Sequence, residues 1–169
     1  MKITVIGCGR WGSFIAWYLD RIKHEVTLYG RESSKHMQRF LTERKNDFLT
    51  LPETVKLETR PDCIDDSDII IISINSQGLQ ALMDEIKPLN IKNKIFVLCM
   101  KGIEISTGRR LSQVANDNLD YSNEVAVWLG PGHVQEFYNG IPNCMVIDSI
   151  NEKVKKLLVE NFSSDLIRF

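Results

Sequence analysis

Residues 3–12 read ITVIGCGRWG, a short apolar run followed at once by three glycines, Gly7, Gly9 and Gly12. An amphipathic stretch with apolar side chains at helical spacing continues over residues 11–22. The order strand, tight turn, helix distinguishes a dinucleotide-binding turn from three unrelated glycines. In such a turn the first glycine permits the bend, the second lets a pyrophosphate approach the backbone, and the third lets helix and strand pack closely. A turn used only for packing is the alternative interpretation.

The composition indicates one globular domain. The chain has 169 residues, of which 43% are hydrophobic and 25% are charged, and this is ordinary for a soluble protein with one core. A net charge of −1 gives no reason to expect nucleic acid or a membrane as a partner. No apolar stretch has the length of a transmembrane helix, and the run after Lys2 is too short for a signal peptide. We therefore expect a cytoplasmic protein.

The four cysteines, Cys8, Cys63, Cys99 and Cys144, are scattered along the chain. They form no C-x-x-C pair, and no histidine stands at a spacing typical of metal ligands. We expect buried free thiols in a reducing compartment and no metal site. Cys8 is interpreted as a small residue in a tight turn, and Cys99 as a core residue of a strand rather than a nucleophile.

Strand and helix patterns alternate along the whole chain. The expected strands are residues 3–6, 26–29, 55–57, 68–74, 94–100, 125–129 and 143–147. The expected helices cover residues 11–22, a segment capped by Ser33 or Ser34 that continues to 44, residues 79–86, a segment capped by Ser106 or Thr107 that continues to 115, a helix around 136, and 154–158. This alternation predicts an α/β fold, a doubly wound, mostly parallel Rossmann-type sheet with helices on both faces. No linker or repeat divides the chain, so we expect residues 1–169 to form one domain.

Ligands of such sheets bind at the carboxyl ends of the strands. This rule selects five loops, residues 7–12, 29–31, 74–76, 100–104 and 130–136.

The residue after the second strand usually decides between NAD and NADP, because an acidic side chain there accepts hydrogen bonds from the ribose and repels a 2′-phosphate. The candidates here are Tyr29, Gly30 and Arg31, and none of them is acidic. Arg31 offers a charged fork suited to a phosphate, which favours NADP or acceptance of both cofactors. A solvated loop arginine is the alternative interpretation.

Several loops resemble those of one family. The matching segments are Gly7-Cys8-Gly9-Arg10-Trp11-Gly12, residues 25–31, Ser73-Ile74-Asn75-Ser76-Gln77, Lys101-Gly102-Ile103-Glu104, residues 130–136, and Gly140-Ile141-Pro142-Asn143. They follow in order over nearly the whole chain and resemble the N-terminal domain of the bacterial-type NAD(P)-dependent sn-glycerol-3-phosphate dehydrogenases. The resemblance therefore implies an oxidoreductase that interconverts dihydroxyacetone phosphate and glycerol 3-phosphate.

The resemblance also implies roles for individual residues. It implies that NADP or NAD is bound by Gly7, Gly9, Arg10, Trp11, Gly12, Arg31, Ser76, Lys101 and Val134. It implies that the substrate contacts Lys101, Gly130 and Gly132. Lys101 is also the candidate catalytic residue, because an ammonium partly desolvated at the end of an apolar strand stabilises negative charge on a carbonyl oxygen. An exposed loop lysine is the alternative interpretation.

The chain departs from the family pattern at three positions. Asn75 replaces a proline, Gly132 replaces a residue with a side chain, and Val134 replaces an alanine.

His133 could supply a proton, but a position at a helix start is the preferred interpretation. Trp128 and Phe137 are interpreted as core residues first, and Glu136 is expected either to form a structural ion pair or to contact the substrate loop.

In this family a second, all-helical domain follows and carries the acid–base pair and the phosphate-binding arginine. We therefore expect the 169 residues alone to bind nucleotide and to turn over little or nothing. A stand-alone NAD(P)-binding module, or a sensor completed by another chain, is the alternative function. A different dehydrogenase with a similar N-terminal half, such as a ketopantoate reductase, is a third possible function. Residues 101–104 and 130–136 argue against it. The resemblance is also compatible with a homodimer.

Overall fold

The computed structural model describes all residues from Met1 to Phe169. Seven strands form one sheet in the order β3-β2-β1-β4-β5-β6-β8, and β7 pairs with β9 in a second, small sheet. The strands are β1 (Lys2–Ile6), β2 (Glu25–Tyr29), β3 (Lys56–Glu58), β4 (Ile69–Ile72), β5 (Ile95–Leu98), β6 (Glu124–Leu129), β7 (Asn143–Cys144), β8 (Val146–Ser149) and β9 (Ile167–Arg168). The α-helices are α1 (Arg10–Arg21), α2 (Lys35–Glu43), α3 (Leu79–Ile86), α4 (Leu111–Asn118), α5 (Val134–Tyr138) and α6 (Glu152–Phe162).

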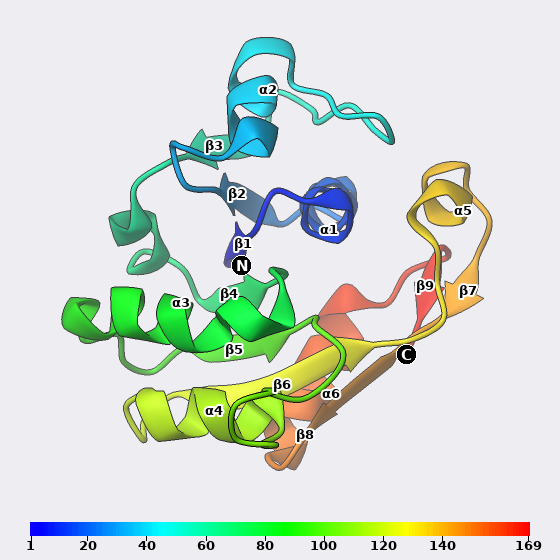
Figure 1. The fold of residues 1–169 in the computed structure, drawn as a ribbon. Helices are drawn as coiled ribbons and strands as arrows, with labels where there is room; N and C mark the ends of the chain where they lie inside the picture. The colour runs from blue at the N-terminus through cyan, green and yellow to red at the C-terminus, as the bar shows by residue number, and fades with distance from the viewer.

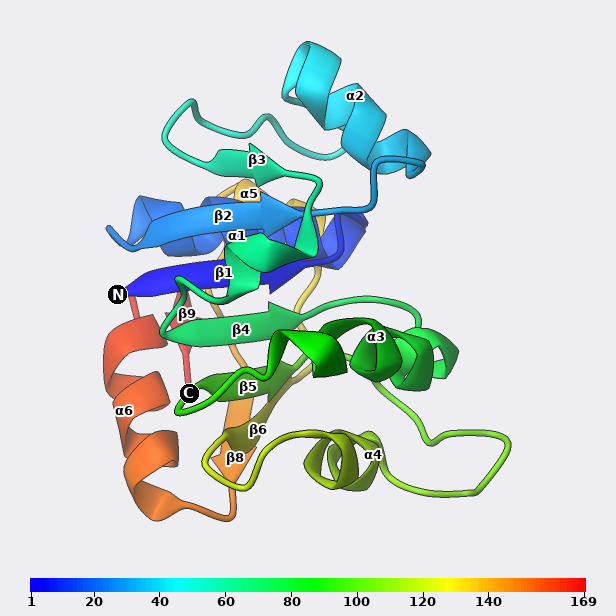
Figure 2. The same cartoon turned by 90° about the vertical axis from the view of Figure 1, so that its left-hand side faces the viewer.

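Helices cover both faces of the large sheet, with α1 and α6 on one side and α3 and α4 on the other (Figures 1 and 2). The central strand β4 consists of four buried isoleucines. Because side chains alternate along a strand, Ile69 and Ile71 join the core cluster under α1 and α6, whereas Ile70 and Ile72 join the cluster under α3 and α4. A strand that is buried on both faces has a continuous run of apolar residues. This run is why the sequence of β4 predicts a strand in the middle of the sheet.

The strand order explains where a ligand can enter. The first six strands are parallel, and the chain moves outward from β1 through β2 to β3 before it crosses back to β4 on the other side of β1. The order reverses between β1 and β4, and in open α/β sheets the crevice lies at such a point. The predicted doubly wound, mostly parallel fold is confirmed.

The prediction of one strand over residues 143–147 is wrong. Residues 143–144 form β7, which pairs in parallel with β9, and β8 pairs antiparallel with β6. The partner changes at Met145, which is buried and donates its backbone N–H to the carbonyl of Arg168 at 2.8 Å. Strand β9 was not predicted, because two residues are too short to show an alternating pattern.

The predicted cap of α4 is also wrong. The helix begins at Leu111 after Arg110, whose N–H donates to Oε1 of Gln113 at 3.0 Å. Thr107 instead donates its hydroxyl to the carboxylate of Glu104 within the preceding loop. An isolated bridge between Ile103 and Arg110 closes this loop. The loop after β5 is therefore longer than expected.

All four cysteines are free, but only Cys8 is buried. Cys63 and Cys99 are partly exposed, and Cys144 is exposed because β7 lies in the small surface sheet. The expectation of four buried thiols is therefore wrong for these three.

None of the six α-helices combines the length and apolar character that a bilayer crossing requires. No group of three or more His, Cys, Asp or Glu side chains is arranged to hold a metal ion.

Candidate functional site

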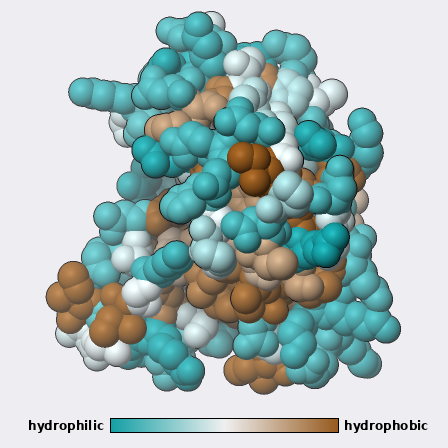
Figure 3. Space-filling model, turned by 90° about the vertical axis from the view of Figure 1, so that its right-hand side faces the viewer, coloured by the Kyte–Doolittle hydropathy of each residue, from teal (hydrophilic) through white to brown (hydrophobic).

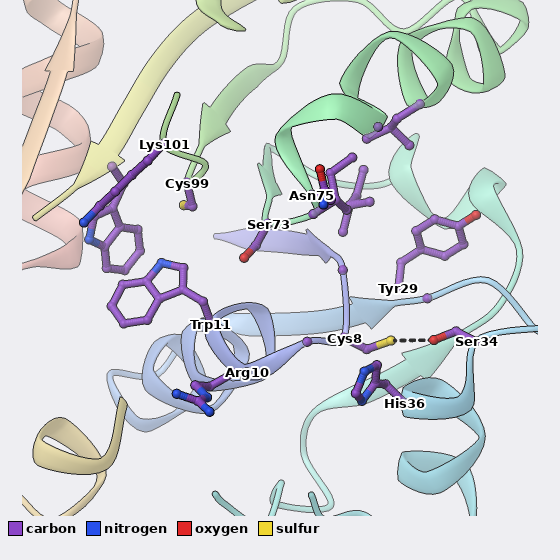
Figure 4. A pocket seen from close by; sticks show the side chains of 18 of the residues that line it. Cys8, Arg10, Trp11, Tyr29, Ser34, His36, Ser73, Asn75, Cys99 and Lys101 are labelled. Atoms are coloured by element: carbon purple, nitrogen blue, oxygen red, sulfur yellow. Dashed lines mark hydrogen bonds between the residues drawn. The ribbon is translucent and has the colours of Figure 1, made fainter. Parts of the chain in front are cut away.

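The five predicted loops meet at one cleft of about 830 Å³ at the carboxyl ends of the parallel strands. Trp11, Cys99 and Lys101 lie at one end of this cleft, and Tyr29 and Ser34 lie at the other (Figure 4). The glycine turn lies between the two ends. The cleft is thus elongated, with β1 and its turn at the middle. An extended ligand with a group at each end suits this shape.

The three glycines of the turn are not equivalent. Gly7 has φ of +112°, and a Cβ there would lie 2.2 Å from the carbonyl oxygen of Ser73. A Cβ on Gly12 would lie 1.9 Å from the carbonyl oxygen of Gly7. Gly9, in contrast, has an ordinary φ of −74° and nothing within 4 Å of its Cβ position. The fold therefore requires Gly7 and Gly12, whereas at Gly9 the missing side chain leaves open space beside the backbone.

The start of α1 provides positive electrostatic potential in the middle of the cleft. Gly9 is the N-cap residue, and neither a capping side chain nor an acidic residue is present in the first turn. The first N–H groups of a helix have no intrahelical acceptor, and the helix dipole adds partial positive charge there. The guanidinium of Arg10 stacks 4.0 Å from the ring centroid of Phe48, which holds it beside the turn. Together these groups give the middle of the cleft the features that anion-binding helix starts share.

Cys8 fits the turn as the small residue that we expected. Its Sγ lies 3.4 Å from Oγ of Ser34, and a Cβ on Gly30 would lie 2.7 Å from that sulfur. Burial raises the pKa of the Cys8 thiol, so the group is neutral near pH 7. It lines the cleft as a packing residue rather than as a nucleophile.

An ion pair lies at the end of the cleft next to β2. Arg31 donates from Nε at 3.2 Å and from Nη2 at 2.7 Å to Oε2 of Glu85, a residue of α3. The buried Tyr29 donates its hydroxyl to Oε1 of the same carboxylate at 3.0 Å. Burial and the Glu85 carboxylate both raise the pKa of Tyr29, which keeps its hydroxyl a donor at neutral pH. Glu85 was not found from the sequence, because it belongs to a helix remote from β2 in the chain.

The opposite end of the cleft depends on the loop after β5. Lys101 lines the cleft, but its side chain is exposed, so the partial desolvation that we expected there is not present. Gln77 fastens this loop to the one after β4. Its Nε2 donates to the carbonyl of Ile103 at 2.9 Å, and its Oε1 accepts the N–H of Ile105 at 2.9 Å. The side chain of one loop thereby fixes the backbone of the loop that carries Lys101.

Replacing Gln77 with alanine is expected to loosen the loop after β5 without unfolding the protein. The change removes the two hydrogen bonds to the loop after β5, worth about 1–2 kcal/mol together, and also the one to the neighbouring Ser76. The amide of Ile105 loses its acceptor, so its hydrogen exchange should accelerate about tenfold or more. Gln80→Ala is the matched control, because Gln80 bonds only to Asp84 and Asn118. Equal exchange at Ile105 in both variants would contradict the role of Gln77.

The cleft includes most of the predicted site residues. Those that line it are Gly7, Gly9, Arg10, Trp11, Arg31, Lys101, Gly130 and Gly132. Three others are not among the lining residues: Gly12 packs against Gly7, Ser76 accepts a hydrogen bond from Gln77, and Val134 is a buried core residue. Sequence reasoning missed Ser34, His36, Ser73, Trp128 and Met145, which also line the cleft.

Some of the missed lining residues matched sequence patterns that indicated a structural role instead. Ser34 was recognised only as a helix cap, and its hydroxyl does accept the N–H of Met37 at 3.4 Å. Trp128 is fully buried, as predicted, but its place near the carboxyl end of β6 also brings it to the wall of the cleft. His133 is the N-cap residue of α5, which confirms its interpretation as a helix-start residue. Nothing in the local pattern marked Met145 as a lining residue.

The packing around Gly132 explains why this position has no side chain. A Cβ at this position would lie 2.0 Å from the ring of Phe137, which is fully buried against α1. The glycine is therefore required by the packing of α5. In this chain the ring of Phe137 occupies the space that a side chain at position 132 would need.

Comparison with known sequences identifies relatives over almost the whole chain. Residues 2–155 match the family model described as NAD-dependent glycerol-3-phosphate dehydrogenase N-terminus. A glycerol-3-phosphate dehydrogenase [NAD(P)+] of Thermoanaerobacter sp. (strain X514) is 32% identical over 99% of this chain and 51% of the relative. The one from Fusobacterium nucleatum is 28% identical over similar shares. The chain thus spans about half the length of the curated relatives it matches.

Solved structures agree with this grouping. The glycerol-3-phosphate dehydrogenase of Coxiella burnetii superposes with a TM-score of 0.89 at 25% identity, over 99% of this chain and 52% of that one. A ketopantoate reductase of Ralstonia eutropha JMP134 shares the fold, with a TM-score of 0.71 at 18% identity over 99% of this chain and 55% of that one. The sequence match separates the two, and it shows that this chain belongs to the NAD-dependent glycerol-3-phosphate dehydrogenase family and corresponds to its N-terminal, NAD-binding domain.

Proposed function

We propose that the cleft binds NADPH or NADH and that this chain supplies the nucleotide-binding half of an enzyme that interconverts dihydroxyacetone phosphate and sn-glycerol 3-phosphate. The observation that carries the proposal is the open space at Gly9, directly over the uncapped start of α1. The fold does not need a glycine there, but a diphosphate that approaches the backbone does. The names of the relatives support the cofactor and substrate classes.

The shape of the cleft supports one placement of the dinucleotide. The diphosphate fits the glycine turn, and the adenosine fits the end with Tyr29, Arg31 and Ser34. The nicotinamide fits the end with Trp11 and Lys101, beside the loop that begins at Gly130. We expect the substrate to reach the cleft at that same end.

The bound nicotinamide supplies the hydride that is transferred to the substrate carbon. Lys101 holds its ammonium at this end and would stabilise the negative charge that develops on the carbonyl oxygen. The loop after β6 contributes backbone groups of Gly130 and Gly132, since neither residue has a side chain to offer. These groups orient the substrate, and the exposed position of Lys101 leaves its ammonium free for this contact.

An apolar surface supports the assignment to a larger enzyme. Ile141, which follows α5, is 53% exposed, and Val146, which begins β8, is 57% exposed. Figure 3 views the side of α5, β7 and β9 and shows apolar side chains gathered among hydrophilic ones. Exposed apolar patches of this kind mark surfaces that another protein segment covers. We propose that further polypeptide, such as the additional length of the relatives or a second subunit in a homodimer, covers it.

Thermal unfolding with added ligands tests this function. NADH and NADPH should each raise the unfolding temperature with concentration, because a ligand of the folded state stabilises it. Dihydroxyacetone phosphate should add a further increase when a dinucleotide is present, and Lys101→Met should abolish most of that increase. Lys92→Met, which removes the same charge before β5, is the control. The absence of any shift with either dinucleotide would refute the proposed function.

A further inference from the structure

We propose that Glu85 is the positioning residue that sets the preference between NADH and NADPH, because it holds the Arg31 guanidinium and offsets its charge. The inference rests on the proposed function, since it concerns the adenosine end of the same cleft. Neither of the two residues directly after β2, Gly30 and Arg31, is acidic, although NAD-dependent enzymes usually carry an acidic residue at the end of this strand, and the next residue, Glu32, is exposed. The carboxylate of Glu85 reaches this place from α3 instead.

The contacts show how firmly Arg31 is held. Two of its donors, Nε and Nη2, meet one carboxylate oxygen, Oε2 of Glu85, at 3.2 and 2.7 Å. An arginine that recognises a phosphate uses the same planar pair of donors. A 2′-phosphate must therefore either displace Glu85 or accept the donors that remain.

Glu85 itself cannot easily turn away. Its second oxygen accepts the hydroxyl of Tyr29 at 3.0 Å, and the Tyr29 side chain is buried at the end of β2. The Glu85 side chain is only 30% exposed, whereas that of Arg31 is 61% exposed. The carboxylate is thus held by contacts on both of its oxygens, and Arg31 is the more exposed partner of the pair.

This geometry determines the net charge that the Arg31–Glu85 pair presents to the cofactor. A free Arg31 would present one positive charge to a 2′-phosphate, which carries up to two negative charges. Paired with Glu85, it presents a group whose net charge is zero. The attraction for NADPH is therefore reduced, while NADH, which has a hydroxyl at this position, is affected little. This arrangement produces a site that accepts both cofactors.

The test measures NADPH and NADH dissociation constants for Glu85→Gln by fluorescence titration at low salt. The variant keeps an oxygen that can accept the Tyr29 hydroxyl but removes the charge. We expect NADPH to bind roughly tenfold more tightly and NADH to change less than about twofold. The gain for NADPH should shrink at high salt, because exposed charges are screened.

Two further variants make the result specific. Asp84→Asn removes the same charge from the neighbouring residue, which is exposed and bonds to Gln80, so the ratio of the two constants should not change. In an Arg31→Met background, Glu85→Gln should lose most of its effect, because Glu85 acts through Arg31. An unchanged ratio in Glu85→Gln, an equal effect of Asp84→Asn, or a full effect without Arg31 would each overturn the inference. If the unaltered chain binds neither dinucleotide, the proposed function fails instead.

Discussion

Alanine at Gly9 is expected to weaken the binding of NADH and NADPH by about a hundredfold or more, which corresponds to about 2.7 kcal/mol. A methyl group there would project into the open space beside the turn, where the diphosphate has to approach the backbone. It meets no protein atom within 4 Å, and the φ of −74° is accessible to any residue. The loss therefore falls on the ligand and not on the fold.

Calorimetric titration of both dinucleotides gives the size of this effect. Thermal unfolding without ligand is the control, and the unfolding temperature of Gly9→Ala should stay within a few degrees of the unaltered chain, because an N-cap glycine and alanine differ by less than about 1 kcal/mol. Binding at unaltered strength would mean that the diphosphate does not contact this turn. The proposed location of the cofactor would then be wrong.

The large sheet could be predicted from the sequence because its strands are covered on both faces. Buried strands such as β4 and β5 are almost entirely apolar, and the glycine turn that follows β1 marks where the first helix begins. Once the strands were known, the rule for their carboxyl ends selected the loops that do line the cleft. The prediction relied on patterns within each segment and on one topological rule.

The missed features depend on contacts between distant segments. Glu85 lies 54 residues from Arg31, and its role follows only from the tertiary contacts of its side chain with Tyr29 and Arg31 at the end of β2. The split of residues 143–147 depends on Met145, whose N–H pairs with residue 168. Likewise, Gly132 looked like the loss of a side chain until the ring of Phe137 was seen in the same space. No local pattern records such contacts, because they are set by tertiary structure.

Alanine at Gly12 is expected to destabilise the protein by about 3 kcal/mol or more, since a methyl group forced into a filled space requires the backbone to move. The new Cβ would lie 1.9 Å from the carbonyl oxygen of Gly7. Gly7 cannot yield, because its N–H donates to Tyr29 of β2 at 2.9 Å and its other side lies against the carbonyl of Ser73 after β4. The turn is thus fixed between two neighbouring strands.

Urea denaturation of Gly12→Ala measures this loss as a lower midpoint, and Gly9→Ala is the matched control. The two variants carry the same added methyl group three residues apart, one in a filled space and one in an open space. A midpoint for Gly12→Ala equal to that of the control would contradict the packing role of the third glycine. The expected outcome separates two roles within one turn, because the fold needs Gly7 and Gly12, whereas Gly9 has no packing role and is where we propose that the diphosphate binds.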